Sequence, residues 1–160
     1  MLFLLAAPGV VAGIIPWWIT GWRGVDWGGA GWLVIPVAAL IIAAGIGFLL
    51  HAFARFAMQG VGAPAPVAPT RHLVVTGVYR WVRNPMYLAV VSIVLGQALL
   101  LGSWALAAYA GVLIPVFWSF VRFYEEPTLR DRFGNEYDDY LARVPGWVPK
   151  RPVATKGVRE

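Results

Sequence analysis

The sequence predicts an all-α membrane protein, a polytopic helical bundle of about four transmembrane helices with a cytoplasmic amphipathic helix near the C-terminus. Hydrophobic residues make up 59% of the chain and charged residues only 13%, with a mean hydropathy of +0.67. Soluble domains carry about 25% charged residues, so this chain has too few charges to cover a water-exposed surface. The 160 residues are expected to form a single membrane-embedded domain, 1–160.

Apolar stretches near the length that a bilayer requires, about 20 residues, predict the transmembrane helices. They cover residues 2–19, 30–53, 85–101 and 104–121. A signal peptide is the competing interpretation of the first stretch. No positively charged segment precedes it and Pro16-Trp17-Trp18 is a poor cleavage site, so we expect a retained helix. Gly102-Ser103 predicts a tight antiparallel hairpin between the last two stretches.

The distribution of arginine and lysine predicts the orientation. The loop between the first two stretches holds Arg23 against Asp26, whereas the linker 54–84 holds four arginines and no acid. The tail 122–160 holds eight lysines or arginines. The positive-inside rule therefore places the linker and both termini in the cytoplasm, as expected for the inner membrane of a prokaryote. In this apolar background the net charge of +5 favours membrane lipids over nucleic acid as partners.

The tail contains a segment with helical periodicity. Its apolar positions fall near one face of a helix: Leu129, Phe133, Tyr137, Tyr140 and Leu141. This pattern predicts a charged amphipathic helix that lies at the membrane surface. Gly134 weakens the helix and is a point where it can break in two.

The segment RNPMY (Arg83–Tyr87) stands where the linker enters the third apolar stretch. One interpretation is capping, since Asn84 suits the N-cap and Pro85 suits the first helical position. The other is an anion site, because a helix N-terminus presents unpaired N–H groups and Arg83 lies beside it. Both interpretations remain open from the residues alone.

The segment EEP (Glu125–Pro127) follows the fourth apolar stretch. The acids are either a solvated helix start, where negative charge is favourable, or a functional pair. As a functional pair they would bind the arginines of the linker or a cationic ligand.

Four other residues have structural expectations. His51 and Arg55 share one helical face at the cytoplasmic end of the second stretch, where Arg55 is expected to extend to the interface. Gln97 is expected to make an interhelical hydrogen bond, and Gly45 to allow close helix packing. Two histidines and no cysteine predict no metal site.

Taken in order, these segments resemble the superfamily of isoprenylcysteine carboxyl methyltransferases and phospholipid methyltransferases. The similarity runs from Gly60 to Pro149: first GVGAPAPVAPTRHLVVTGVYRWVRNPMYLAVV, then a two-helix hairpin, then EEPTLRDRFGNEYDDYLARVPGWVP. Each piece alone is weak, whereas the ordered set is specific.

The resemblance implies an S-adenosylmethionine-dependent methyltransferase whose hydrophobic or lipid acceptor, a carboxylate or an amine, enters from the bilayer. The implied cofactor-binding residues are Arg83, Asn84, Pro85, Tyr87, Glu125, Glu126 and Tyr79. Arg83 and Asn84 would hold the methionyl carboxylate, and either glutamate the ribose hydroxyls or the ammonium. Tyr87 would pack on the cofactor, while Tyr79, Trp81 and Tyr124 would face the adenine or the sulfonium.

Asn84 stands where prenylcysteine enzymes carry histidine, and an amide cannot act as a base at neutral pH. Two alternative functions are an NADPH-dependent reductase of the sterol-reductase type and a non-catalytic membrane scaffold. The reductases are generally longer, and no helix here has enough polar residues to line a permeation path.

Overall fold

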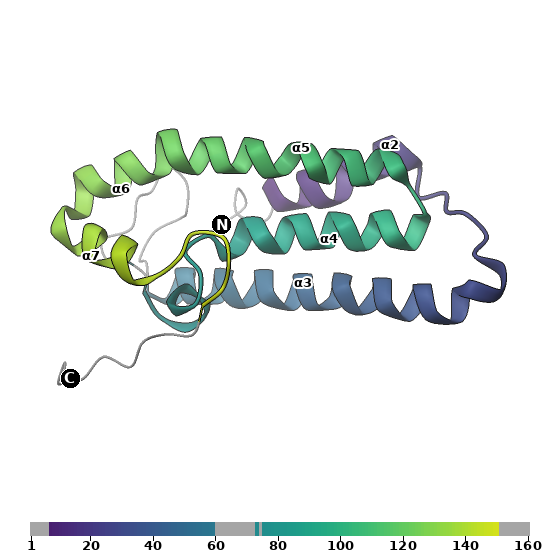
Figure 1. The fold of residues 1–160 in the computed structure, drawn as a ribbon, viewed down its shortest axis with the longest axis horizontal. Coiled ribbons are helices and arrows are strands. Elements are labelled where there is room, and N and C mark those ends of the chain that lie inside the picture. The colour runs from purple at the N-terminus through teal and green to yellow at the C-terminus, as the bar shows by residue number, and fades with distance from the viewer. Residues whose placement is uncertain (1–6, 60–72, 74, 151–160) are drawn as a thin grey trace.

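The computed structural model describes residues 7–59, 73 and 75–150, and all regular elements in this part of the chain are helical (Figure 1). The all-α prediction is therefore confirmed. The elements are η1 (Val10–Ile14), α2 (Ile15–Thr20), η2 (Gly28–Ala30), α3 (Gly31–Gln59), η3 (Gly77–Arg80), α4 (Pro85–Leu101), α5 (Trp104–Phe120), η4 (Val121–Glu125), α6 (Glu126–Phe133) and α7 (Asn135–Arg143).

Helices α3, α4 and α5 run side by side, and α4 lies between the other two (Figure 1). Glycines bring α3 and α4 close together. A Cβ atom on Gly45 would lie 2.8 Å from Cγ1 of Ile93, and one on Gly96 would lie 2.6 Å from Cγ1 of Ile42. The predicted packing role of Gly45 is thus confirmed.

The first helical segment is tied to the bundle by polar side chains. The Gln97 amide donates to the Ala12 carbonyl at 2.6 Å, and the Tyr109 hydroxyl donates to the Val11 carbonyl at 3.1 Å. Both carbonyls lie in the π-helical turn η1, where the wider turn disturbs the regular helical hydrogen bonds. The predicted interhelical bond of Gln97 is confirmed.

One end of the bundle contains the α4–α5 hairpin, which is as tight as predicted. Gly102 adopts the left-handed conformation (φ 61°), and the Ser103 side chain accepts a hydrogen bond from the Leu106 N–H. The loop between α2 and α3 covers this turn at the same end (Figure 1). There the Val25 N–H donates to the Leu101 carbonyl at 3.2 Å, and the Trp27 indole donates to the Leu100 carbonyl at 3.0 Å.

Two helical runs are long and apolar enough to cross a membrane, Gly28–Arg55 and Trp104–Phe133. Two shorter apolar helices are Ala7–Thr20 and Pro85–Leu101. The first predicted stretch begins at residue 2, and its first five residues lie outside the described part of the chain. The helices expose large apolar side chains, among them Trp32 (78%) and Leu40 (70%). Such a surface suits contact with lipid rather than water.

The opposite end of the bundle carries the tail. Helix α5 continues through the π-turn η4 into α6, and the chain then breaks at Gly134 (φ 54°) before α7. The apolar face predicted for the tail helix packs inside the protein, with Tyr137, Tyr140 and Val144 buried. The break falls at Gly134, where the sequence allowed it, whereas the apolar face of α7 is buried in the protein and does not lie on the membrane surface as predicted.

Candidate functional site

The motif residues before α4 are fixed by the chain that follows α7. The Arg83 N–H donates to the Pro145 carbonyl at 2.9 Å, and the Lys150 N–H donates to the Trp81 carbonyl at 3.0 Å. The Asn84 backbone N–H and its side-chain amide both donate to the Gly146 carbonyl, at 3.3 and 3.2 Å. We call residues 145–150 the C-terminal strap.

The strap binds the side chain of Asn84. Asn84 stands at the N-cap position of α4 as predicted, but its side chain makes no cap hydrogen bond there, and its amide donates to the strap instead. The backbone of Asn84 (φ −114°, ψ 55°) lies outside the extended region that N-cap residues usually occupy. Pro85 occupies the first turn of α4 as predicted. An N–H group at this position would have no partner within the helix, so proline loses no hydrogen bond there.

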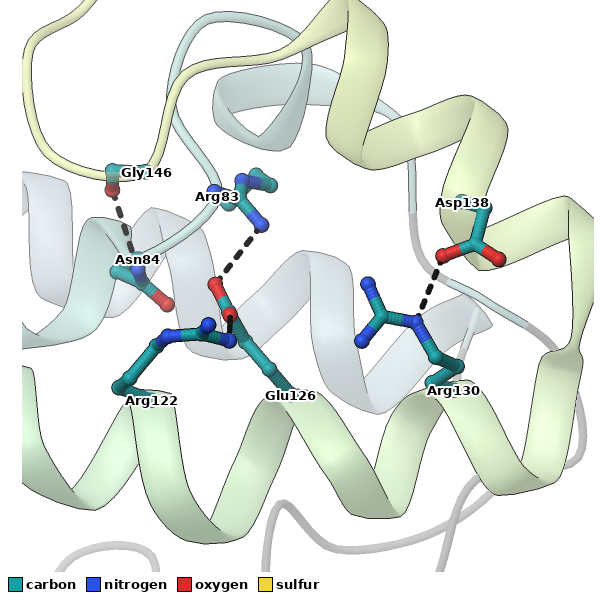
Figure 2. Close-up of polar contacts among 7 residues, drawn as sticks. All are labelled: Arg83, Asn84, Arg122, Glu126, Arg130, Asp138 and Gly146. Carbon is teal, nitrogen blue, oxygen red and sulfur yellow. Dashed lines mark hydrogen bonds and ion pairs between the residues drawn. The ribbon is translucent and has the colours of Figure 1, made fainter.

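Glu126 joins two arginines from different elements (Figure 2). Its Oε1 lies 3.1 Å from Nη1 of Arg83, and its Oε2 lies 3.1 Å from Nη1 of Arg122. The side chains of Arg83 and Glu126 are 16% and 13% exposed, whereas that of Arg122 is 54% exposed. Of the two interpretations of the acids, pairing with a linker arginine therefore holds for Glu126.

Arg83 keeps a second hydrogen-bonding edge beyond Glu126. Its buried Nε has no hydrogen-bond partner among the described residues. A Cβ atom on Gly146 would lie 3.2 Å from Nη2 of Arg83, so glycine lets the strap run close to the guanidinium. The Nε–H and Nη2–H groups form one fork of the guanidinium, which matches the geometry of a carboxylate.

Glu125 faces a different partner. The Tyr87 hydroxyl donates to its Oε1 at 2.5 Å. The Tyr87 ring lies 4.7 Å from the Phe117 ring and 6.3 Å from the Trp147 ring, centroid to centroid. Tyr87 thus links the start of α4, the end of α5 and the strap.

The two glutamates follow a helical irregularity. Val121–Glu125 forms the π-turn η4, within a helical run that continues from α5 into α6. The acids therefore do not stand at the free start of a separate helix, and the solvated-start interpretation is wrong. Single π-turns inside α-helices occur frequently at functional sites, because they redirect the side chains that follow.

The surroundings of Glu125 make its carboxyl group harder to ionise than an exposed one. Burial raises the pKa of the Glu125 carboxyl, and the hydrogen bond from Tyr87 partly offsets this rise. Burial also raises the pKa of the Tyr79 and Tyr140 phenols, so both stay neutral. The site therefore combines a polarisable carboxyl group with neutral phenols and the permanent charge of Arg83.

Six of the seven predicted site residues gather at this end: Arg83, Asn84, Pro85, Tyr87, Glu125 and Glu126. The seventh, Tyr79, also borders the cluster, because its phenol lies near enough to Glu125 and Tyr87 to interact with them electrostatically. It is buried against Ala52, and its carbonyl accepts a hydrogen bond from the Tyr140 hydroxyl at 2.7 Å. Trp81 and Tyr124 are 45% and 44% exposed. Tyr124 stacks on Phe120, so these two aromatic residues do not join the cluster around Arg83.

An apolar groove of about 380 Å³ lies between α4 and α5. It is lined by Leu88, Val91, Ile114, Pro115, Trp118 and Trp147. Trp147 also contacts Tyr87, so the groove begins beside the polar cluster.

The sequence predicted no site role for Arg122 or for the strap residues Gly146 and Trp147. Arg122 stands four residues before Glu126, a spacing that signals a helical ion pair. GWVP (Gly146–Pro149) is a turn-rich segment with one large aromatic residue, yet nothing local indicates that it contacts residue 84.

The phospholipid methyltransferase family matches residues 33–136, well over half of the chain. The chain belongs to this family. The matched range contains all seven predicted site residues and ends before the strap. The sequence resemblance is therefore confirmed.

A curated relative points in the same direction. The chain is 34% identical over 82 residues to a protein-S-isoprenylcysteine O-methyltransferase from Schizosaccharomyces pombe. The alignment covers 51% of this chain and 35% of the relative, so the chain spans about a third of that protein's length. No solved structure matches the chain significantly.

Proposed function

We propose that this member of the family is a membrane methyltransferase that uses S-adenosylmethionine to methylate a lipid-like acceptor. The family and the name of the relative support this activity. The observation that carries the proposal is the meeting of Arg83 and Tyr87, at the start of α4, with Glu125 and Glu126, at the end of α5.

The residues at the site suit such a donor. Arg83 offers a buried Nε–H without a partner among the described residues, which fits a carboxylate. Among the described residues, Glu125 accepts a hydrogen bond from Tyr87 and keeps acceptor capacity for hydroxyl or ammonium groups. When bound, S-adenosylmethionine would supply a methyl group already activated by its sulfonium.

Each side chain then has a separate role. Arg83 would hold the methionyl carboxylate through the edge that carries its unpartnered Nε–H, while Glu126 keeps the guanidinium in place and Arg122 pairs with Glu126. Glu125 would accept from the ribose hydroxyls or pair with the ammonium, and Tyr87 would pack on the donor. Because the methyl group needs no further activation, the protein mainly orients the two reactants, which can lower the barrier by about 7–11 kcal/mol.

The acceptor would reach this site from the bilayer. The groove between α4 and α5 is lined by apolar side chains and passes Trp147 to reach Tyr87. An acyl or prenyl chain in this groove would not have to enter water. Its reactive head, a carboxylate or an amine, would lie beside the polar cluster.

We further propose four membrane crossings in the inner membrane of a prokaryote, with the site and both termini on the cytoplasmic side. The 17 residues of α4 span about 25 Å, so the bilayer would thin slightly around it. The chain has no natural cysteine, so single cysteines report cleanly. Arg23→Cys and Arg143→Cys should label from opposite sides of the membrane, and labelling from the same side contradicts the arrangement.

The central experiment is transfer of a radiolabelled methyl group from S-adenosylmethionine to total membrane lipids, followed by identification of the product. Calorimetry with S-adenosylhomocysteine should detect binding, whereas NADPH should not bind. Binding of NADPH alone would replace the proposal with a reductase.

A further inference from the structure

We propose that His51 and Arg55 form a second binding site, which holds the phosphate of a membrane phospholipid. The two side chains leave the last part of α3 and meet η3 at Gly77. A Cβ atom on Gly77 would lie 3.0 Å from Nε of Arg55 and 3.2 Å from Nε2 of His51. Since both nitrogens lie so close to the same point, they are no more than about 6 Å apart. One phosphate can bridge such a gap with two charge-assisted hydrogen bonds of about 2.8 Å.

Neither side chain has another partner. In the described part of the chain, no hydrogen bond or ion pair involves the side chain of His51 or of Arg55, and the linker 54–84 contains no acid. Other arginines at this end are paired: Arg83 and Arg122 with Glu126, and Arg130 with Asp138 at 2.8 Å (Figure 2). Arg55 is thus a partly buried cation whose charge nothing nearby in this structure balances.

Gly77 is suited to this arrangement in two ways. Its φ of +59° belongs to the left-handed region, which side chains rarely adopt. Its missing side chain also leaves room for the side chains of His51 and Arg55, because any Cβ atom would press against the two nitrogens. The glycine therefore lets α3 and η3 approach until the two basic groups converge.

The position of His51 and Arg55 relative to the membrane indicates which ligand they bind. Arg55 is the first charged residue after Asp26 along the chain and follows the apolar part of α3, so it is placed where a membrane-spanning helix leaves the hydrocarbon core. Phospholipid phosphates occupy this level, and basic pockets between helices on the cytoplasmic side bind lipid headgroups. We therefore assign the site to the phosphodiester of a phospholipid rather than to a soluble anion.

The site is separate from the methyl-donor site, although the two share a segment. Tyr79 stands two residues after Gly77 and packs against Ala52 of α3, between His51 and Arg55 in sequence. A lipid held here would stabilise the packing of η3 on α3. The proposal does not depend on methyl transfer, and its test measures binding alone.

The test uses the purified full-length protein in nonionic detergent and follows thermal unfolding and calorimetric binding. The probes are dioctanoyl phosphatidylglycerol, dioctanoylglycerol without phosphate, and inorganic phosphate. We expect phosphatidylglycerol to bind and raise the melting temperature, and dioctanoylglycerol to do neither. Tighter binding of inorganic phosphate than of the phospholipid would overturn the assignment to a lipid.

Variants locate the binding. Arg55→Gln and His51→Gln should each weaken phosphatidylglycerol binding roughly tenfold, as expected for loss of a charged hydrogen bond. Arg55→Lys should weaken it less because the charge remains. Arg23→Gln is the matched control, since it removes an arginine from the opposite end of the bundle, and should bind normally. Normal binding by the His51→Gln/Arg55→Gln double variant would refute the site.

Discussion

The two ends of the helical bundle are closed in different ways. At the hairpin end, Gly102 turns the chain and backbone carbonyls accept hydrogen bonds from Val25 and the Trp27 indole. At the other end, the strap also forms backbone hydrogen bonds, but charged side chains take part as well, through Glu126 between two arginines and Glu125 against Tyr87. Backbone hydrogen bonds and close packing stabilise the hairpin end. The charged end contains a buried polar group without a partner among the described residues, the Nε–H of Arg83, which can bind a ligand.

Among the variants that test this difference between the two ends, Glu125→Gln should have the largest effect. The amide keeps the shape and an acceptor for Tyr87 but loses the charge that the proposed donor requires. We expect the affinity for S-adenosylhomocysteine to fall by about 1.5–3 kcal/mol, or tenfold to more than a hundredfold. Calorimetry measures the change. Glu136→Gln, an exposed acid on α7, makes the same chemical change and should bind normally.

Arg83→Lys should have the next largest effect. Lysine keeps the positive charge but loses the planar fork that offers Nε–H and Nη2–H together. We expect donor affinity to fall by about 1–2 kcal/mol in calorimetry, with little change in the melting temperature. An unchanged affinity would leave Arg83 with the sole role of pairing with Glu126.

At the hairpin end, Gly102→Ala should destabilise the protein without altering the site. A Cβ atom there would lie 2.5 Å from Cγ2 of Val25, and φ of +61° strains any side chain. We expect the free energy of unfolding to fall by about 1–3 kcal/mol. Gly111→Ala is the control, because its Cβ atom would meet nothing within 4 Å. A weaker donor affinity in folded Gly102→Ala would show that the two ends are coupled.

The raised pKa of Glu125 predicts two opposite pH dependences. Because the folded state holds the proton more tightly than the unfolded state, stability without ligand should fall as pH rises from the usual glutamate range through the raised pKa. Donor affinity should rise over the same window, since the ionised carboxylate is the binding form. Unfolding and binding measured against pH check both trends, and Glu125→Gln should remove both.

The smallest effect is expected from Arg122→Gln. The Arg122 side chain is 54% exposed, and exposed ion pairs contribute only about 0–1 kcal/mol. Donor affinity should change less than threefold. A loss as large as that of Arg83→Lys would mean that Arg122 binds the donor directly.

The sequence predicted the features that depend on local pattern. Hydropathy predicted the apolar helices, and Gly102-Ser103 predicted the hairpin. The order of the motifs predicted that Arg83 lies close to Glu126. Antiparallel helices place the start of α4 beside the end of α5, so this convergence follows from the chain's order alone.

The remaining features depend on contacts that local pattern does not encode. Asn84 stands at the N-cap position that capping statistics favour, yet its amide donates to a carbonyl 62 residues away, a contact that no local pattern encodes. The π-turn before Glu126 has no sequence signal, because it reflects the fit between α5 and the bundle. Trp81 and Tyr124 are aromatic like Tyr87, but only tertiary packing separates exposed rings from those in the site.

The strap has a consequence for biosynthesis. The guanidinium of Arg83 and the amide of Asn84 are closed over by residues 145–150, which the ribosome makes about sixty residues later. Membrane insertion of α3, α4 and α5 can therefore precede assembly of the site. During translation the half-made protein would lie in the bilayer with Arg83 uncovered, and only the emerging strap would complete the pocket. A chain that stops before Pro145 should still insert but remain unable to bind the donor.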